Sequence, residues 1–335
     1  MFKLLNDIRI IDLTTIVLGP YATQLLADFG AEVVKIEPED GDIFRAVRPG
    51  RTNDVGAGFM NFNRNKRSVV LDLKSQSGQS ALRELIKDAD VLVHNMRVFS
   101  AERLGIGFKT VQKMNPKLVY CYSPGFGGRG PDKDAPAYDD VIQARSGLAA
   151  LNADISGAPR FVPTIACDKI VGLHLALAIQ AGLIQKEKKG EGVCIEVPML
   201  ETMTSFILSE HLAGYSFIPE EGEVGYTRLT SDNRRPYETR DGYLAILPYS
   251  TKHWVRLFEI TNNVEWQTAE KVTYPVLRSQ HIDELYEKLA ALAKTKSTAE
   301  WRQLLSDADI THAEITGIQD LLVDEHLAAS GMFNV

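Results

Sequence analysis

The first 125 residues alternate between strand-like and helix-like segments, and this alternation constrains the fold more than any other feature. Short apolar runs typical of strands occur at 8–13, 31–37, 67–73, 90–95 and 117–123. Segments with helical spacing of apolar residues separate them, at 21–29, 78–88 and 108–114. Strands that alternate with helices predict βαβ units, in which helices cover both faces of a parallel sheet. We therefore expect an α/β protein with a Rossmann-like parallel sheet.

The rest of the chain predicts a second, smaller domain. A long helix over 169–189, a strand over 193–197 and a helical stretch over 199–213 continue the first pattern. A polar, turn-rich segment at 214–236 reads as a linker, and strand and helix patterns resume after it. A length of 335 residues also suggests about two domains. We expect a large domain over 1–213, a linker over 214–236 and a small α+β domain over 237–315, with 316–335 as a segment that can return to the large domain.

Composition narrows the classes of partner. The formal net charge of −7 argues against a nucleic-acid partner, because binding to phosphate backbones needs a basic face. The chain has three cysteines without CxxC spacing and scattered histidines, so we expect neither a disulfide framework nor a metal site. The N-terminus lacks a secretory pattern, and we expect no apolar stretch that approaches the length of about 18 residues needed to span a bilayer. We expect a cytoplasmic protein with no membrane partner.

The stretch GFGGRG at 125–130 matches the spacing of a dinucleotide-binding loop. That fingerprint needs a helix to open at the last glycines, so that its N-terminus meets the pyrophosphate. Here Pro131 and the polar residues DKDAPA follow, which predicts a loop. We therefore do not expect dinucleotide binding.

Three segments at predicted strand ends favour an anionic ligand. The turn TTIVLGP at 14–20 leads from the first strand into a helix, where backbone N–H groups can hold an anion or a thioester carbonyl, although an ordinary connection fits equally. The stretch NRNKRSVVLDLKS at 63–75 is the densest in basic residues, and it reads either as a solvated face or as cations for ligand phosphates. Arg97 and Arg103 follow another strand.

Asp168 in PTIACDKIVG stands directly before the predicted helix over 169–189. Asp is among the best N-cap residues, which predicts a capping role. A carboxylate at a helix N-terminus in an apolar surround would also stay ionised, through the helix dipole and N–H donors, and could act as a nucleophile. The neighbouring Cys167 reads as a small buried hydrophobe rather than as a nucleophile. The local sequence favours the cap and leaves the nucleophile open.

Ordered motifs along almost the whole chain resemble a known family. They are IRIIDLTTIVLGPYATQLLADFGAEVVKIEPEDGD, NRNKRSVVLDLKS, HNMRVFSAERLG, GFGGRGP, AYDDVIQARSGL, CDKIVGLHLALAIQAGLIQKEKKGEGVCIEVPMLE and RRPYETRDGYLAI. With these motifs the chain resembles the family III CoA-transferases, the CaiB/BaiF family of formyl-CoA transferase and carnitine CoA-transferase. The resemblance implies an interlocked homodimer, with acyl-CoA and a small carboxylic acid as substrates and no tightly bound cofactor.

The resemblance also implies a mechanism and site residues. An aspartate in the position of Asp168 attacks the thioester carbonyl of the donor, which gives an acyl-aspartyl anhydride and then an aspartyl-CoA thioester. The acceptor carboxylate then collects CoA through a second anhydride. The residues that match the family's CoA contacts are Val17, Leu18, Leu71, Lys74, Asn95, Met96, Arg97, Arg103 and Tyr138.

Two alternative functions share this scaffold. Related racemases of 2-substituted acyl-CoA carry a histidine before the aspartate of a G-H-D motif, whereas this chain reads Ala137-Tyr138-Asp139. Without that histidine, two-base proton exchange loses a partner, so transfer is favoured over racemisation or epimerisation. A catalytically silent CoA-binding protein is the other alternative, because some CoA contacts differ: Pro38 and Pro136 stand where some relatives carry an arginine and a lysine.

Overall fold

The computed structural model describes residues 3–52, 54–153 and 156–333. The chain divides into two compact units, Met1–Ser209 and Glu210–Val335. Each unit has a hydrophobic core of its own, so each is described by itself.

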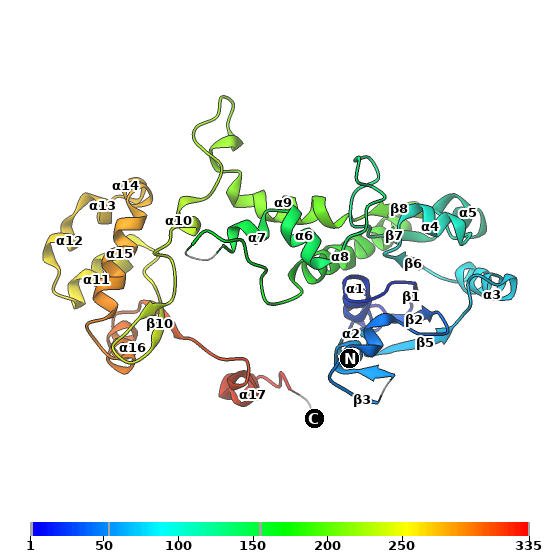
Figure 1. Ribbon diagram of the computed structural model, residues 1–335, viewed down its shortest axis with the longest axis horizontal. Coiled ribbons are helices and arrows are strands. Elements are labelled where there is room, and N and C mark those ends of the chain that lie inside the picture. Colours follow the sequence, from blue (N-terminus) through cyan, green and yellow to red (C-terminus); the bar gives the residue numbers. More distant parts are fainter. Residues whose placement is uncertain (1–2, 53, 154–155, 334–335) are drawn as a thin grey trace. The chain divides into compact units, whose positions relative to one another are not determined.

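The first unit is built on a parallel sheet of six strands in the order β5-β2-β1-β6-β7-β8 (Figure 1). The strands are β1 (Arg9–Asp12), β2 (Glu32–Glu37), β5 (Lys66–Val70), β6 (Val91–His94), β7 (Val119–Tyr122) and β8 (Val193–Glu196). Every pairing between neighbours is parallel. The predicted Rossmann-like α/β fold is therefore confirmed. The predicted strands of this sheet begin and end within two residues of their observed bounds, except that β5 ends three residues earlier than predicted.

Alternating side chains along β1 explain why helices cover both faces of this sheet. Ile10 packs with α1 (Leu18–Asp28) and α8 (Ala166–Lys189) in one core. Its neighbour Ile11 points to the opposite face and packs with α3 (Gln76–Lys87) and α5 (Phe108–Met114) in another. Both isoleucines are fully buried. A strand that is apolar at successive positions is the pattern expected when both faces of a sheet are covered.

The order of the strands places a ligand site at one edge. The chain goes from β1 to β2 on one side of β1, and later to β6 on its other side. The carboxyl ends of β1 and β6 therefore face a point where the direction of winding reverses. In open α/β sheets ligands bind in the crevice outside the strand ends at such a point.

Helix α8 begins three residues earlier than the sequence predicts and runs for 24 residues. It is the one helix in the described part of the chain with the length and apolar composition of a membrane span, so the expectation that no such stretch exists was wrong. Its buried side packs in the core of the first unit with α1 and the sheet, through Cys167, Val171, Leu175 and Ile179. Burial of this kind is also what the core helix of a folded domain requires.

The first unit also contains short elements outside the sheet. They are η1 (Ile43–Ala46), β3 (Gly50–Thr52), β4 (Val55–Gly56), α2 (Ala57–Asn63), α4 (Val98–Arg103), α6 (Asp139–Arg145), α7 (Leu148–Leu151) and most of α9 (Met199–His211). After β7 the next helix is α6, which begins nine residues beyond GFGGRG, so no helix opens at those glycines. Instead, the Gly127 and Gly128 N–H groups donate to the carboxylates of Glu201 and Glu196.

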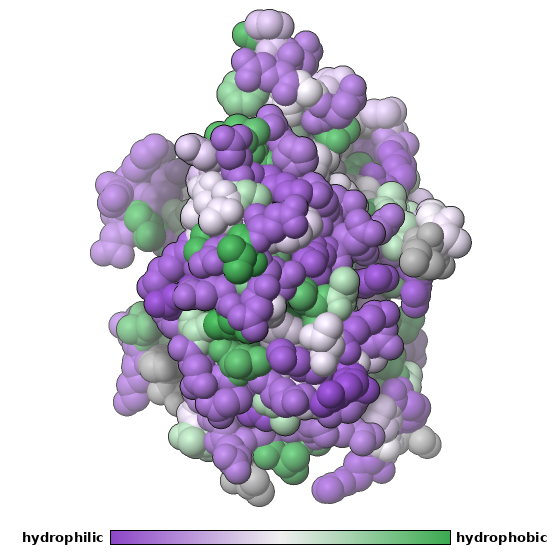
Figure 2. All heavy atoms as spheres, turned by 90° about the vertical axis from the view of Figure 1, so that its left-hand side faces the viewer, coloured by the Kyte–Doolittle hydropathy of each residue, from purple (hydrophilic) through white to green (hydrophobic). Residues whose placement is uncertain are grey.

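The second unit is a small α+β unit around an antiparallel sheet in the order β11-β10-β9. Its core holds Trp254, Leu257, Phe258, Leu289 and Trp301. Hydrophilic side chains cover most of the face in Figure 2, with hydrophobic residues between them in small groups. The elements are η2 (Ala213–Ser216), α10 (Thr227–Thr230), β9 (Tyr237–Glu238), β10 (Tyr243–Leu247), α11 (Thr251–Ile260), α12 (Val264–Thr268), α13 (Glu270–Thr273), α14 (Pro275–Gln280), α15 (Ile282–Ala293), α16 (Thr298–Asp307), β11 (Thr311–Glu314), η3 (Asp320–Val323) and α17 (Glu325–Ala329).

Candidate active site

Asp168 lies in the first turn of α8, and the residue is 8% exposed. The N-cap of this helix is Ile165, which makes no capping bond with its side chain. The prediction that Asp168 is the N-cap was therefore wrong, because Ala166 and Cys167 already belong to the helix. Cys167 is fully buried, as expected, and burial raises the pKa of its thiol to about 12.

A second carboxylate supplies the missing cap from another helix. The backbone N–H of Asp168 donates to Oδ1 of Asp139, the first residue of α6, over 2.9 Å. Oδ2 of Asp139 accepts from Nε2 of Gln143 over 2.6 Å, and Oε1 of Gln143 accepts from the N–H of Val162 over 2.8 Å. All of these groups lie beside the start of α8, where backbone N–H groups have no partner within the helix. Asp139 thus fixes the helix end and brings a negative charge close to Asp168.

Burial and the charge of Asp139 raise the pKa of Asp168 to about 7, against the lowering effect of a hydrogen bond from the backbone N–H of Leu18. The expectation of a carboxylate that stays fully ionised is corrected by this value. Desolvation disfavours the charged form, and a like charge nearby adds to that effect. Near neutral pH the carboxyl of Asp168 therefore exists in both forms, and its ionised form is poorly solvated and basic.

Asp168 forms part of the wall of a cavity of about 290 Å³ at the carboxyl ends of β1 and β6. The cavity brings together Asp168 and five of the residues predicted to contact CoA. The lining residues are Thr15, Ile16, Leu18, Asn95, Met96, Arg97, Ser100, Ser123, Gly125, Ala135, Pro136, Ala137, Tyr138, Asp168 and Met199. Tyr138, at 64% exposed, stands at the N-terminus of α6.

Four predicted residues do not line this cavity. The side chain of Val17 is fully buried where α1 begins. Leu71 and Lys74 follow the carboxyl end of β5, and Arg103 is the last residue of α4, which follows β6. Lys74 and Arg103 are exposed. These residues come after strand ends at the same edge of the sheet, but the structure does not place them in the cavity.

Two of the predicted residues make contacts within the protein that the sequence does not indicate. The side-chain amide of Asn95 binds the turn after β1: it donates to the carbonyl of Thr15 and accepts from the N–H of Thr15, each over 3.0 Å. Nη1 of Arg97 donates to the carbonyl of Asp134 over 2.8 Å. Asn95 therefore supports the wall of the cavity, and Arg97 ties the loop before α6 to the start of α4.

In the basic stretch around β5, Arg64, Arg67 and Lys74 are exposed, whereas Lys66 fits neither reading of the sequence. Lys66 is 2% exposed at its side chain and lies 3.3 Å from a carboxylate oxygen of the buried Asp12. Burial lowers the pKa of Lys66 to about 8, although Asp12 opposes the shift. Arg64 pairs with Asp28 at 2.5 Å, and Arg67 pairs with Glu32. Lys66 is thus an internal counterion, neither a solvated residue nor one available to ligand phosphates.

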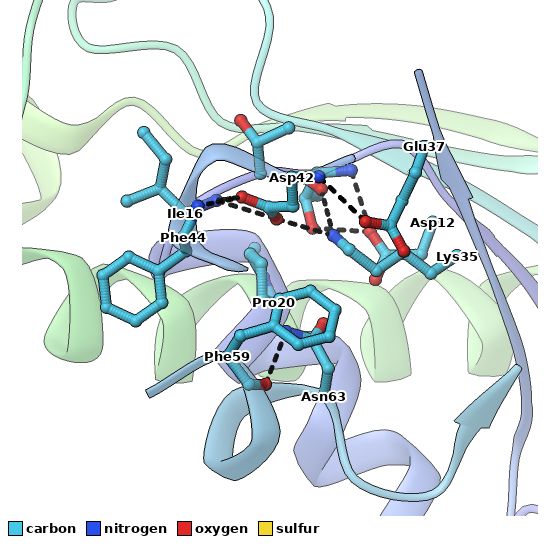
Figure 3. A network of polar contacts seen from close by, with 12 residues as sticks. Asp12, Ile16, Pro20, Lys35, Glu37, Asp42, Phe44, Phe59 and Asn63 are labelled. Atoms are coloured by element: carbon cyan, nitrogen blue, oxygen red, sulfur yellow. Dashed lines mark hydrogen bonds and ion pairs between the residues drawn. The ribbon is translucent and has the colours of Figure 1, made fainter. Parts of the chain in front are cut away.

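A buried network under the turn after β1 was missed by the sequence analysis (Figure 3). Its most deeply buried charged members are Asp12, Lys35 and Asp42, whose side chains are all at most 1% exposed. Burial by itself would raise the pKa of Asp12, but Lys66, Lys35 and the hydroxyls of Thr14 and Thr23 outweigh it and lower the pKa. The only signal in the sequence is that these charged residues occur in or just after apolar strands.

Among the described residues, no group of three or more His, Cys, Asp and Glu side chains is arranged to hold a metal ion. The polar groups that face the cavity are carboxylate, amide, guanidinium, hydroxyl and backbone N–H. Such a set suits an organic ligand that is fixed by hydrogen bonds.

Known proteins resemble this chain over almost its full length. Residues 5–335 match the model of CoA-transferase family III. Succinyl-CoA:glutarate CoA-transferase of Mus musculus is 30% identical over 332 residues, which cover 98% of this chain and 76% of the relative. Formyl-CoA:oxalate CoA-transferase of Rhodopseudomonas palustris (strain BisB18) is 30% identical over 354 residues, covering 99% and 83%.

Solved structures agree with this family relation. The crystal structure of Rv3272 from Mycobacterium tuberculosis superimposes with a TM-score of 0.85 at 27% identity, covering 98% of this chain and 88% of that one. A CAIB/BAIF family protein from Brucella suis shares the fold, with a TM-score of 0.81 at 23% identity over 99% and 89% of the two chains. The resemblance seen in the sequence motifs is confirmed: this protein is an enzyme of the CoA-transferase type and belongs to CoA-transferase family III.

Proposed function

We propose that the enzyme moves CoA from an acyl-CoA donor to a carboxylic acid acceptor, with Asp168 as the nucleophile. The observation that carries this proposal is the position of Asp168, a buried carboxyl with a pKa of about 7 in the wall of the cavity. A desolvated carboxylate that ionises near neutral pH is a stronger nucleophile than an exposed one. A group of this kind at a cavity is also a candidate for a functional site on physical grounds.

The proposed reaction has four steps that balance. The Asp168 carboxylate attacks the thioester carbonyl of the donor, the C–S bond breaks, and CoA leaves as a thiolate. The thiolate attacks the Asp168 carbonyl of the resulting anhydride, which releases the donor acid and leaves an aspartyl-CoA thioester. The acceptor carboxylate attacks that thioester and expels the thiolate again. The thiolate finally attacks the acceptor carbonyl, which frees acyl-CoA and the Asp168 carboxylate.

We place the reacting end of CoA in the cavity beside Leu18, Asn95, Met96, Arg97 and Tyr138. A volume of about 290 Å³ suits the acyl thioester and the adjoining chain rather than the whole of CoA. Leu71, Lys74 and Arg103 follow strand ends at the same edge of the sheet, and we assign them to the nucleotide end of CoA. Val17 has a buried side chain, so its contact would come from its backbone. No tightly bound cofactor is needed, because the two substrates and Asp168 supply all reacting groups.

The relatives suggest which substrates to test first. Two of them are named for succinyl-CoA with glutarate and for formyl-CoA with oxalate, so we propose short acyl-CoA donors and dicarboxylic acid acceptors. The test measures CoA exchange in both pairs and traps the acylated enzyme with hydroxylamine, which converts an aspartyl anhydride or thioester into a hydroxamate. We expect a hydroxamate at Asp168 in the wild type and none in Asp168→Asn. Exchange by Asp168→Asn at the wild-type rate would overturn the proposal.

Two further measurements, of deuterium exchange and of CoA binding, separate the two alternatives. An enzyme that exchanges α-protons of a 2-methylacyl-CoA with deuterium without any acceptor would be a racemase or epimerase. We expect no such exchange, because Tyr138 stands where the racemases carry a histidine. Binding of CoA without turnover of any donor would indicate a silent CoA-binding protein.

We also propose a homodimer, interlocked as in the family. Supporting this, α8 leaves Leu173, Leu177 and Ile184 exposed, and α9 leaves Phe206 and Leu208 exposed. Exposed apolar side chains along helices are common at subunit interfaces. Light scattering of the purified protein tests the proposal: a mass of about 37 kDa, that of the single chain, would contradict it.

A further inference from the structure

The turn between β1 and α1 contains a residue in an unfavourable backbone conformation. Ile16 has φ of +73°, in the left-handed region. A β-branched residue is rarely found there, because its side chain crowds the backbone, and glycine would fit without cost. Conformations of this kind persist only where the surrounding structure imposes them, and they cluster at functional sites. Ile16 lines the cavity next to Thr15 and Leu18.

Side chains from three other parts of the first unit hold the residues before Ile16. The N–H and the hydroxyl of Thr14 both donate to Oδ1 of Asp12, over 2.8 and 2.5 Å. The carbonyl of Thr14 accepts from Nζ of Lys35 over 2.7 Å. The side-chain amide of Asn95 accepts from the N–H of Thr15 and donates to its carbonyl. The path of the chain into Ile16 is therefore set by groups outside the turn.

Asp42 holds Ile16 itself. Its two carboxylate oxygens accept from the Ile16 N–H over 3.1 and 3.2 Å, as Figure 3 shows. Asp42 is fixed in turn by Lys35, whose Nζ lies 2.9 Å from Oδ2, and by Glu37, whose Oε2 accepts from the Asp42 N–H over 2.8 Å. Oδ1 also accepts from the N–H of Phe44 over 3.0 Å. The ion pair is fully buried, so removing one partner alone would leave an unpaired internal charge.

The direction of the turn decides where the next donor points. Leu18 begins α1 two residues after Ile16 and lines the same cavity as Asp168, and its backbone N–H is the donor that lowers the pKa of the Asp168 carboxyl. A change in φ at Ile16 would rotate the chain that follows it, and would move this donor away from Asp168. We propose that Asp42, supported by Lys35, is a positioning residue that locks Ile16 in the left-handed conformation and so aims the Leu18 N–H at the nucleophile.

This inference rests on the proposed function only because it gives Asp168 the role of nucleophile. The effect of Asp42 on Asp168, through Ile16 and the Leu18 N–H, can be tested without turnover. Few charged groups surround Asp168 and Asp42. Asp139 and the neutral thiol of Cys167 neighbour Asp168. Those around Asp42 are Lys35 and Glu37 on β2, Arg45 on η1 and Lys66 on β5, and Asp12 on β1 interacts with both lysines.

The test compares two double variants with the same charge, Lys35→Met/Asp42→Asn and Lys35→Met/Asp42→Ala. Both lack the buried ion pair, but only the asparagine keeps an oxygen that can accept from the Ile16 N–H. The titration of Asp168 is followed by NMR of ¹³C-labelled aspartate carboxyls, with Asp168→Asn used to assign the signal. We expect the midpoint of Asp168 to lie about one pH unit higher in the alanine variant, because its carboxylate loses a donor. Equal midpoints, or a lower midpoint in the alanine variant, would overturn the proposal.

A measurement on the wild type keeps the proposal testable if a double variant does not fold, which circular dichroism reveals. The amide proton of Leu18, in protein labelled with ¹⁵N-leucine, should shift with pH at the same midpoint as the Asp168 carboxyl. Leu18→Ile assigns this signal. An amide that does not follow the titration of Asp168 would refute the link from Asp42 to the nucleophile. Neither experiment needs acyl-CoA, so a failure to observe CoA exchange would refute the proposed function alone.

Discussion

At the scale of single residues, the ionisation of Asp168 links the site to the stability of the fold. Its pKa is about 7 in the folded protein and 3.8 in an unfolded chain. The folded state therefore binds more protons than the unfolded state between these values, and stability falls as pH rises from about 4 through 7. Above pH 7 the buried charge destabilises the fold in full.

Replacing Asp168 by Asn should therefore stabilise the protein at alkaline pH. The amide has the shape of the carboxyl but never carries its charge, so at pH 8 we expect a gain on the order of 2–4 kcal/mol. At pH 4 the gain should disappear, since Asp168 is then protonated in the wild type. Urea unfolding at the two pH values measures both numbers. A gain that is equal at pH 4 and pH 8 would show that the pKa is not raised.

Lys66 offers a second prediction at this scale. Lys66→Met removes a buried cation and leaves Asp12 with one fewer counterion, so we expect a loss of about 3 kcal/mol. Arg67→Met, one residue along β5, removes an exposed partner of Glu32 and should change stability by less than about 1 kcal/mol. Urea unfolding of both variants checks the contrast. Equal losses would mean that the burial of Lys66 has no energetic consequence.

At the scale of helices and strands, two glycines on α8 allow the effect of helix packing on stability to be distinguished from its effect on the geometry around Asp168. A Cβ at Gly172 would lie 2.7 Å from the carbonyl oxygen of Leu18, and a Cβ at Gly182 would lie 2.6 Å from a methyl of Val119. Either clash must be relieved by movement, and overpacking of this kind destabilises by about 1–3 kcal/mol. Only Gly172 faces the residue whose N–H reaches Asp168.

We therefore expect Gly172→Ala and Gly182→Ala to lower stability by similar amounts but to differ in their effect on the site. Gly172→Ala pushes α1 away from α8, so it should raise the titration midpoint of Asp168 and slow formation of the hydroxamate. Gly182→Ala should leave both unchanged. A loss of acylation that is equal in the two variants would mean that general destabilisation, and not the spacing of α1 and α8, controls the site.

Periodicity predicted the elements well wherever a strand or helix has a continuous apolar pattern. The six strands of the parallel sheet, and helices such as α3 and α5, lie close to their predicted ranges. The start of α8 was misplaced because Asp168 is a good capping residue by itself, while the true cap, Asp139, comes from 29 residues away. Short elements such as α4 and the strand pair β3–β4 were missed, because three to six residues carry too little pattern.

The site was predictable only in part, for a similar reason. Family motifs identified the residues around the cavity, but the pairing of Lys66 with Asp12, or of Asp42 with the Ile16 N–H, joins segments that are distant in the sequence. A lone charged residue in an apolar strand does not reveal its partner. Burial, which sets the pKa of Asp168, depends on the packing of α1, α6 and α8 together.

At the scale of the whole molecule, the two units have separate cores, and the three tryptophans report on one of them. Trp254, Trp266 and Trp301 are all the tryptophans of the chain, and all belong to the core of the unit Glu210–Val335 or pack against it. Tryptophan fluorescence therefore follows the unfolding of this unit, whereas far-ultraviolet circular dichroism follows helices of both. Domains with cores of their own can unfold as separate cooperative units.

We expect substitutions in the two units to move the two signals independently. Gly172→Ala should lower the urea midpoint of the circular dichroism signal and leave the fluorescence midpoint in place. Leu289→Ala truncates a fully buried side chain of the second unit and should cost about 2–5 kcal/mol, which lowers the fluorescence midpoint. In that variant, the part of the circular dichroism change that comes from unfolding of the first unit should keep its urea midpoint. If either substitution shifts both signals together, the two units unfold as one, and stability losses in the second unit would then reach Asp168 as well.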